Sequence, residues 1–132
     1  MPAFNLTKNT WLATTVRKAD NFLTRLVGLL RRTSLGAEEA LWLIPSKGVH
    51  TFGMRFPIDV IFLNENNKVI DVIREMAPNR ISRLHLSSHS ILELPHGAIQ
   101  KSTTMVGDQL EILLAESSEM DDLKNTALNK VS

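Results

Sequence analysis

The chain has 132 residues, of which 43% are hydrophobic and 22% charged, and its formal net charge is +1 at pH 7. This length suits one domain with its own core, and so small a charge gives no electrostatic reason to expect nucleic acid binding. The chain contains no cysteine, which excludes disulfides, thiolate metal sites and cysteine nucleophiles. No apolar run reaches the roughly 18–20 residues of a membrane helix. We therefore expect a cytoplasmic protein with neither membrane nor nucleic acid as a partner.

The first third of the chain predicts a strand, a helix and a second strand. Threonine and tryptophan within residues 10–17 favour a strand. An amphipathic helix is expected over residues 20–31, where apolar residues recur at spacings of three and four and Asp20 or Asn21 can cap the first turn. The short apolar run at residues 41–44, which is closed by Pro45, then indicates a strand.

The most strongly patterned stretch is a hairpin over residues 58–76. Residues 58–63 are apolar except for Asp59, so this strand should be buried on both faces. The turn at residues 64–67 contains three asparagines, a residue type that tolerates the left-handed backbone. Because side chains of a regular strand alternate, the second strand should place Val69, Asp71, Ile73 and Glu75 on one face and Lys68, Ile70, Val72 and Arg74 on the other.

The rest of the chain predicts two more strands and a polar tail. Residues 90–94 form a strand that Pro95 ends, and residues 109–114 form a strand after the turn signal at residues 107–108. Residues 116–132 are either a frayed tail or a short helix, so the domain should span residues 1–115. We expect an α+β fold that is mostly β, a small antiparallel barrel-like or sandwich domain of about six short strands with one helix near residues 20–31.

Asp59 is the most unusual residue of the hairpin, because a buried carboxylate is costly unless it is paired or hydrogen-bonded. In a structural interpretation, it accepts hydrogen bonds from loop N–H groups or pairs with Arg55 or Arg80. In a functional interpretation, it lines a pocket with His50 and Thr51, since perturbed carboxylates gather at functional sites. Seven residues are candidates for ligand binding and are expected to converge at one end of the domain: His50, Thr51, Met54, Arg55, Asp59, Arg80 and Glu93.

Other kinds of site have weaker signals. His85 and His89 are four residues apart, but they lack the glutamate of the zinc-binding His-Glu-x-x-His pattern, so we expect surface histidines and no metal. The Gly-x-Ser-x-Gly motif of α/β-hydrolases, the phosphate loop and the dinucleotide fingerprint are all absent. We therefore expect no cofactor, and the sequence assigns neither a reaction class nor an oligomeric state.

Four motifs occur in a fixed order along the chain. They are Arg25-x-x-Gly28-Leu29-Leu30-x-Arg32, His50-Thr51-x-x-Met54-x-x-x-Ile58-Asp59-x-x-Phe62, Leu92-Glu93-Leu94-Pro95-x-Gly97 and Gly107-Asp108, with Val69 and Pro78 between the second and the third. In this order and spacing the chain resembles the bacterial and archaeal family called domain of unknown function 192, over roughly residues 10–114. The resemblance implies a small, mostly antiparallel, barrel-like β structure with one or two helices. It implies no activity, because the family is named for lacking a known one.

Two functional hypotheses from different classes follow, and an enzyme of unassigned reaction class stays open. The first is a binding module whose pocket around His50 and Asp59 holds a small polar ligand or a peptide. It requires a concave site in which solvent reaches both residues. The second is a protein-interaction or accessory domain in which the polar cluster is purely structural. It requires an exposed apolar patch or a strand edge available for pairing.

Overall fold

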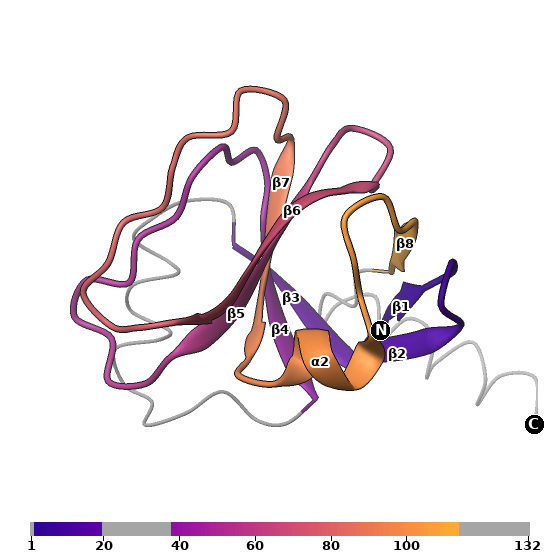
Figure 1. Cartoon of the computed structure of the whole chain (residues 1–132), viewed down its shortest axis with the longest axis horizontal. Helices are drawn as coiled ribbons and strands as arrows, with labels where there is room; N and C mark the ends of the chain where they lie inside the picture. Colours follow the sequence, from indigo (N-terminus) through magenta and orange to yellow (C-terminus); the bar gives the residue numbers. More distant parts are fainter. Residues whose placement is uncertain (1, 20–37, 114–132) are drawn as a thin grey trace, which may run out of the picture.

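The structure is a computed structural model that describes residues 2–19 and 38–113. Within these residues it contains eight strands and one short helix, shown in Figure 1. The elements are β1 (Ala3–Asn5), β2 (Thr10–Ala13), β3 (Thr15–Ala19), β4 (Glu39–Leu43), β5 (Ile58–Leu63), β6 (Val69–Met76), β7 (Ser90–Pro95), α2 (Ala98–Ser102) and β8 (Leu110–Ile112). The helix predicted near residues 20–31 and the tail at residues 116–132 lie outside the described residues.

A five-stranded sheet in the order β3-β4-β7-β5-β6 forms the centre of the fold. Only the β3–β4 pair is parallel among its described pairings. All six residues of β5 are buried, as the apolar pattern of residues 58–63 predicted, and Asn67 has the expected left-handed backbone, with φ 60°. A second sheet of three short antiparallel strands has the order β2-β1-β8.

Two apolar clusters cover the two faces of the large sheet. On one face, Ile61 and Leu63 of β5 pack in a cluster with Ile99 of α2 and residues of all three strands of the small sheet. On the other face, Val60 and Phe62 pack against residues from the loop that precedes β5. Figure 1 accordingly shows β1, β2 and β8 on one side and the loops before β5 and β7 on the other. The domain is therefore a sandwich-like, mostly β, α+β structure, which confirms the predicted fold class.

The structure corrects several element boundaries. The predicted strand at residues 10–17 is two strands, because β2 pairs with β1 in the small sheet and β3 pairs with β4 in the large one. Strand β1 and helix α2 were not predicted, since three and five residues are too few to show a period. The strand predicted at residues 41–44 begins earlier and is observed at Glu39–Leu43.

The regular alternation predicted for β6 is wrong, because its pairing with β5 shifts at two points. Val69 and Val72 pack against the cluster that contains Ile61, whereas Ile70 and Ile73 pack against the other cluster. A bulge adds a residue to one strand and reverses the faces that follow it. Glu75 lies in the second irregularity and has a positive φ of 53°.

Candidate functional site

Asp59 is enclosed and fully engaged by the backbone around it. Its side chain is on β5, and the residue is 1% exposed. One carboxylate oxygen, Oδ1, accepts a hydrogen bond from the backbone N–H of Glu75 at 3.0 Å. The other, Oδ2, accepts from the N–H groups of Gly97 at 3.1 Å and Ile99 at 2.9 Å. The Nδ1 atom of His96 lies 3.7 Å from Oδ1.

The three donors share a physical reason for needing an acceptor. A β-bulge leaves the N–H of its extra residue outside the ladder, and the first N–H groups of a helix have no intrahelical partner. Asp59 satisfies the bulge N–H of Glu75 together with two N–H groups at the start of α2, where Gly97 adopts φ 96°. Bonds from loop N–H groups are one of the structural roles expected for this carboxylate. Its engagement leaves it poorly placed to contact a ligand.

The seven candidate residues do not converge on one point. Asp59 is paired in register with Leu94, whereas Glu93 is paired with Val60. Because residues directly opposite each other share a face of a sheet, the side chains of Asp59 and Glu93 point to opposite faces. Glu93 is fully buried.

Thr51 connects the loop before β5 to the loop before β7. Its hydroxyl donates a hydrogen bond to the carbonyl of Ala77 at 2.6 Å and accepts one from the N–H of Arg80 at 2.9 Å. The N–H of Thr51 donates to the carbonyl of Arg80, also at 2.9 Å, and His50 forms an isolated β-bridge with Ile81. The structure thus brings His50, Thr51 and Arg80 together, while Met54 is buried nearby in the core.

The two loops that Thr51 joins are here called the paired loops and comprise residues 44–57 and 77–89. Backbone hydrogen bonds continue along them, from Ser46 to His89, from Ser82 to Val49 and from His85 to Lys47, at 2.8–3.0 Å. Among their 27 residues (14 + 13) there is no aspartate or glutamate, although the whole chain has 14 of these residues. The paired loops are therefore joined along their length, and neither of them carries a negative side chain.

This surface carries both positive and apolar side chains. Arg55, Arg80 and Arg83 are exposed, and within the described part of the chain none of the three makes an ion pair. Four large apolar side chains are also exposed, namely Phe52 (49%), Ile81 (73%), Leu84 (74%) and Leu86 (81%). Exposed apolar side chains that gather in one place indicate an interaction site more often than isolated ones do.

The second paired loop is fixed to the sheet by His85. The imidazole ring stacks on the buried ring of Phe62, with 4.0 Å between ring centroids. Its Nε2 atom lies 2.7 Å from Oδ2 of Asp71, and its Nδ1 atom lies 3.2 Å from the carbonyl oxygen of Arg83. Both neighbours are acceptors, so a ring nitrogen that carries a proton can donate to the oxygen beside it. These contacts attach this part of the loop to both strands of the hairpin.

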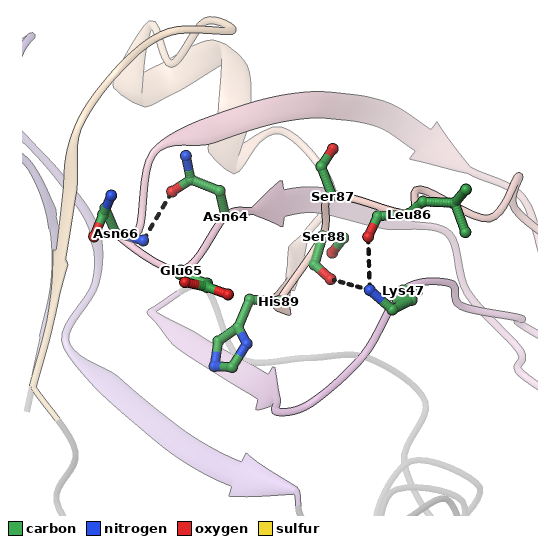
Figure 2. Close-up of a pocket in the computed structure, with 8 residues that line it drawn as sticks. All are labelled: Lys47, Asn64, Glu65, Asn66, Leu86, Ser87, Ser88 and His89. Atoms are coloured by element: carbon green, nitrogen blue, oxygen red, sulfur yellow. Dashed lines mark hydrogen bonds between the residues drawn. The ribbon is translucent and has the colours of Figure 1, made fainter.

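A pocket of about 350 Å³ lies where the paired loops meet the β5–β6 turn. Figure 2 shows the eight residues that line it, which are Lys47, Asn64, Glu65, Asn66, Leu86, Ser87, Ser88 and His89. None of the seven residues predicted from the sequence is among them. Asn64 follows the last residue of β5, whereas Asp59 is near its first, so the pocket is at the opposite end of that strand. The polar turn was recognised in the sequence, but its proximity to Lys47 and His89 depends on long-range packing.

Residues 2–19 and 38–113 contain neither a cluster of metal ligands nor a helix that could span a membrane. No three or more histidine, aspartate or glutamate side chains are placed to hold a metal ion there. His85 and His89 face different surroundings, since His85 contacts Asp71 and Phe62 and His89 lines the pocket. The same residues contain no helix long and apolar enough to cross a membrane.

Comparisons with known proteins place the chain in a family without assigning an activity. The family model of DUF192, described as "Uncharacterized ACR", matches residues 4–112. A UPF0127 protein from Pyrococcus furiosus is 36% identical over 112 residues, which are 81% of this chain and 94% of that protein. A UPF0127 protein from Pyrococcus horikoshii is 31% identical, again over 81% of this chain, and over 95% of its own length.

Two solved structures share the fold at low sequence identity. A protein of unknown function from Novosphingobium aromaticivorans superposes with a TM-score of 0.71 at 20% identity, covering 85% of this chain and 84% of that one. A putative transcription regulator from Sinorhizobium meliloti gives a TM-score of 0.62 at 19% identity, covering 73% and 79%. The family model spans most of the chain, and the resemblance noted in the sequence is confirmed: the chain belongs to the DUF192 family of uncharacterised proteins.

Proposed function

We propose that this protein is an interaction module that binds an acidic polypeptide through its paired loops. One observation carries the proposal: the 27 positions of the two paired loops lack acidic side chains but expose four large apolar side chains and three arginines that make no ion pair with any described residue. Arginine is well suited to carboxylates because its guanidinium forms bidentate hydrogen bonds. A partner with acidic and apolar side chains would complement both features of the surface.

The rigidity of the surface supports this proposal. Thr51 and His85 fix the two loops to each other and to the sheet, so little conformational freedom is lost when a partner binds, and this lowers the cost of association. The absence of cysteine is compatible with a reducing compartment, so we place the interaction in the cytoplasm.

The other functional hypothesis, a ligand pocket around His50 and Asp59, has less support. It requires solvent to reach both residues, and Asp59 is 1% exposed with three backbone N–H donors on its carboxylate. The second hypothesis, an interaction domain in which the polar cluster around Asp59 is purely structural, requires an exposed apolar patch. The exposed apolar side chains of the paired loops meet this requirement. The contacts of Asp59 and the exposure of the paired loops therefore both favour the interaction module.

Fluorescence anisotropy with a labelled peptide of glutamate and leucine residues tests the proposal. We expect the wild-type protein to bind this peptide and the double variant R80Q/R83Q to bind it about ten-fold more weakly, because two attractive charges are lost at the interface. The hydrogen bonds that Arg80 makes to Thr51 use backbone atoms, so the glutamines leave the loop pairing in place.

The matched control is the double variant R17Q/K101Q, which removes the same charge from exposed positions outside the paired loops. It should bind the peptide as the wild type does. If both double variants weaken peptide binding equally, the effect arises from net charge alone, and the proposal is overturned. Binding to vesicles that contain phosphatidylserine, without binding to the peptide, would also overturn it in favour of an anionic membrane surface.

A further inference from the structure

The pocket at the β5–β6 turn has two charged side chains of opposite sign that do not pair with each other. Lys47 and Glu65 both line it, yet no ion pair joins them among the described residues, so their charged atoms are more than 4.0 Å apart. In Figure 2 the carboxylate of Glu65 is directed toward the same hollow that the ammonium of Lys47 borders. Opposite charges held apart across a small pocket suit a ligand that carries both charges.

The ammonium group of Lys47 is held in place before any ligand arrives. It donates hydrogen bonds to the carbonyl oxygens of Leu86 at 2.6 Å and Ser88 at 3.3 Å. An ammonium group has three N–H donors, so one remains for a ligand. Because the other two bonds fix its position, binding a carboxylate there requires little reordering of the lysine side chain.

Other polar side chains of the pocket are also available to a ligand. Glu65, Asn66, Ser87 and His89 have no side-chain hydrogen bond or ion pair in the described structure. Asn64, by contrast, is committed to its turn, since its Oδ1 accepts bonds from the N–H groups of Asn66 and Lys68 at 2.9 Å. The pocket thus combines fixed walls with uncommitted donors and acceptors, which is how polar ligands are oriented in small sites.

Backbone hydrogen bonds make the walls of the pocket rigid. The N–H of His89 donates to the carbonyl of Leu63 at 2.8 Å, and the N–H of Ser46 donates to the carbonyl of His89 at 3.0 Å. The turn is closed by a bond of 3.0 Å from the N–H of Asn67 to the carbonyl of Asn64. The three segments that supply the lining are therefore attached to one another, and the shape of the pocket does not depend on a ligand.

We propose that this pocket binds a small zwitterion of the amino acid type, with its carboxylate on Lys47 and its ammonium group on Glu65. The volume of about 350 Å³ is at the small end of ligand pockets, which suits such a molecule. The proposal does not rest on the acidic-partner function, although Lys47 and Leu86 belong to both the pocket and the paired loops.

The test uses isothermal titration and amide-resolved NMR with free amino acids as probes. Glycine, β-alanine and γ-aminobutyrate vary the separation of the two charges, the remaining common amino acids vary the side chain, and acetate and methylammonium each carry one charge alone. We expect at least one zwitterion to bind and to shift the amide signals of Glu65 and His89, while acetate and methylammonium at equal concentration do not.

The nearly isosteric variant E65Q removes one of the two charges at an exposed position. It should weaken the zwitterion's binding about ten-fold or more, as expected for losing a hydrogen bond to a charged group, while the control E111Q on β8 should bind like the wild type. Absence of binding by every probe, binding that E65Q leaves unchanged, or equal binding of acetate would each overturn the zwitterion proposal. None of these outcomes bears on the acidic peptide, whose binding depends on Arg80 and Arg83.

Discussion

At the level of single residues, Asp59 shows how the hydrogen bonds of one buried carboxylate can join a strand, a bulge and the start of a helix. Taking a carboxylate out of water is unfavourable, and several hydrogen bonds are needed to offset that cost. Three backbone donors from two distant segments supply them. Asp59, the most unusual residue of the predicted hairpin, is therefore explained by the backbone donors that surround it.

The substitution Asp59→Asn should lower the free energy of unfolding by about 2–4 kcal/mol. The asparagine side chain keeps one acceptor oxygen, but its NH2 group then faces backbone N–H donors and cannot accept a hydrogen bond from them. Chemical denaturation of the variant beside the wild type measures this change. Glu111→Gln, a similar change at an exposed position, should alter stability little and is the control. A variant as stable as the wild type would contradict the structural role given to Asp59.

At the level of elements, the paired loops owe their order to a few specific contacts. The ring of His85 covers Phe62 on β5 and meets Asp71 on β6, so the second loop is attached to both strands of the hairpin. Without such contacts, a loop with three large exposed apolar side chains would lose its defined surface, since those side chains gain little from burial.

Replacing Asp71 by asparagine should loosen this loop without unfolding the domain. The variant loses the charge-assisted hydrogen bond at 2.7 Å, and such bonds contribute about 1.5–3 kcal/mol. We expect the amides of residues 77–89 to exchange at least ten-fold faster with solvent, and those of β5 to remain as slow as in the wild type. Hydrogen exchange followed by NMR gives this comparison. Uniform acceleration across both regions would indicate global destabilisation instead.

Local sequence patterns predicted some elements and could not predict others. Strand β5 and its asparagine turn were recognised, because an apolar run followed by turn residues is visible within ten positions. The faces of β6 were mispredicted, because its pairing with β5 shifts register between Val69 and Asp71, and such a shift depends on the neighbouring strand and leaves no local pattern. Of the seven residues predicted to converge, the structure brings His50, Thr51 and Arg80 together. Whether Asp59 and Glu93 share a face depends on the pairing register of β5 and β7, which no local pattern contains.

At the level of the whole molecule, the small sheet joins the two ends of the described chain. Strand β1, residues 3–5, pairs with β8, residues 110–112. Beneath this pairing Asp108 accepts hydrogen bonds from the side chain of Asn5, the N–H of Met105 and the ammonium of Lys8, each at 3.0 Å. Burial alone would raise the pKa of Asp108, but these bonds outweigh it and hold the pKa below its usual value of 3.8.

The lowered pKa of Asp108 makes a contribution to stability that depends on pH. Because the folded state favours the ionised carboxylate, this contribution is fully present above the unfolded pKa of about 3.9 and is lost as pH falls through the folded pKa. The stability difference between the wild type and Asp108→Asn should therefore be constant from about pH 5 upward and shrink in more acidic solution. Urea denaturation between pH 2.5 and 6 measures it, and a difference that grows on acidification would contradict this account.

The covered face of the central sheet and the exposed paired loops lie on opposite sides of the molecule. The small sheet and α2 close one face of the central sheet, while the paired loops lie on the other side (Figure 1). The paired loops expose both arginines and apolar side chains. Amide-resolved NMR titration with the glutamate–leucine peptide tests the interaction function most directly. We predict that the shifted signals lie in residues 44–57 and 77–89 and that added salt reverses the shifts. Signals that move only in β1, β2 and β8, or none that move at all, would contradict it.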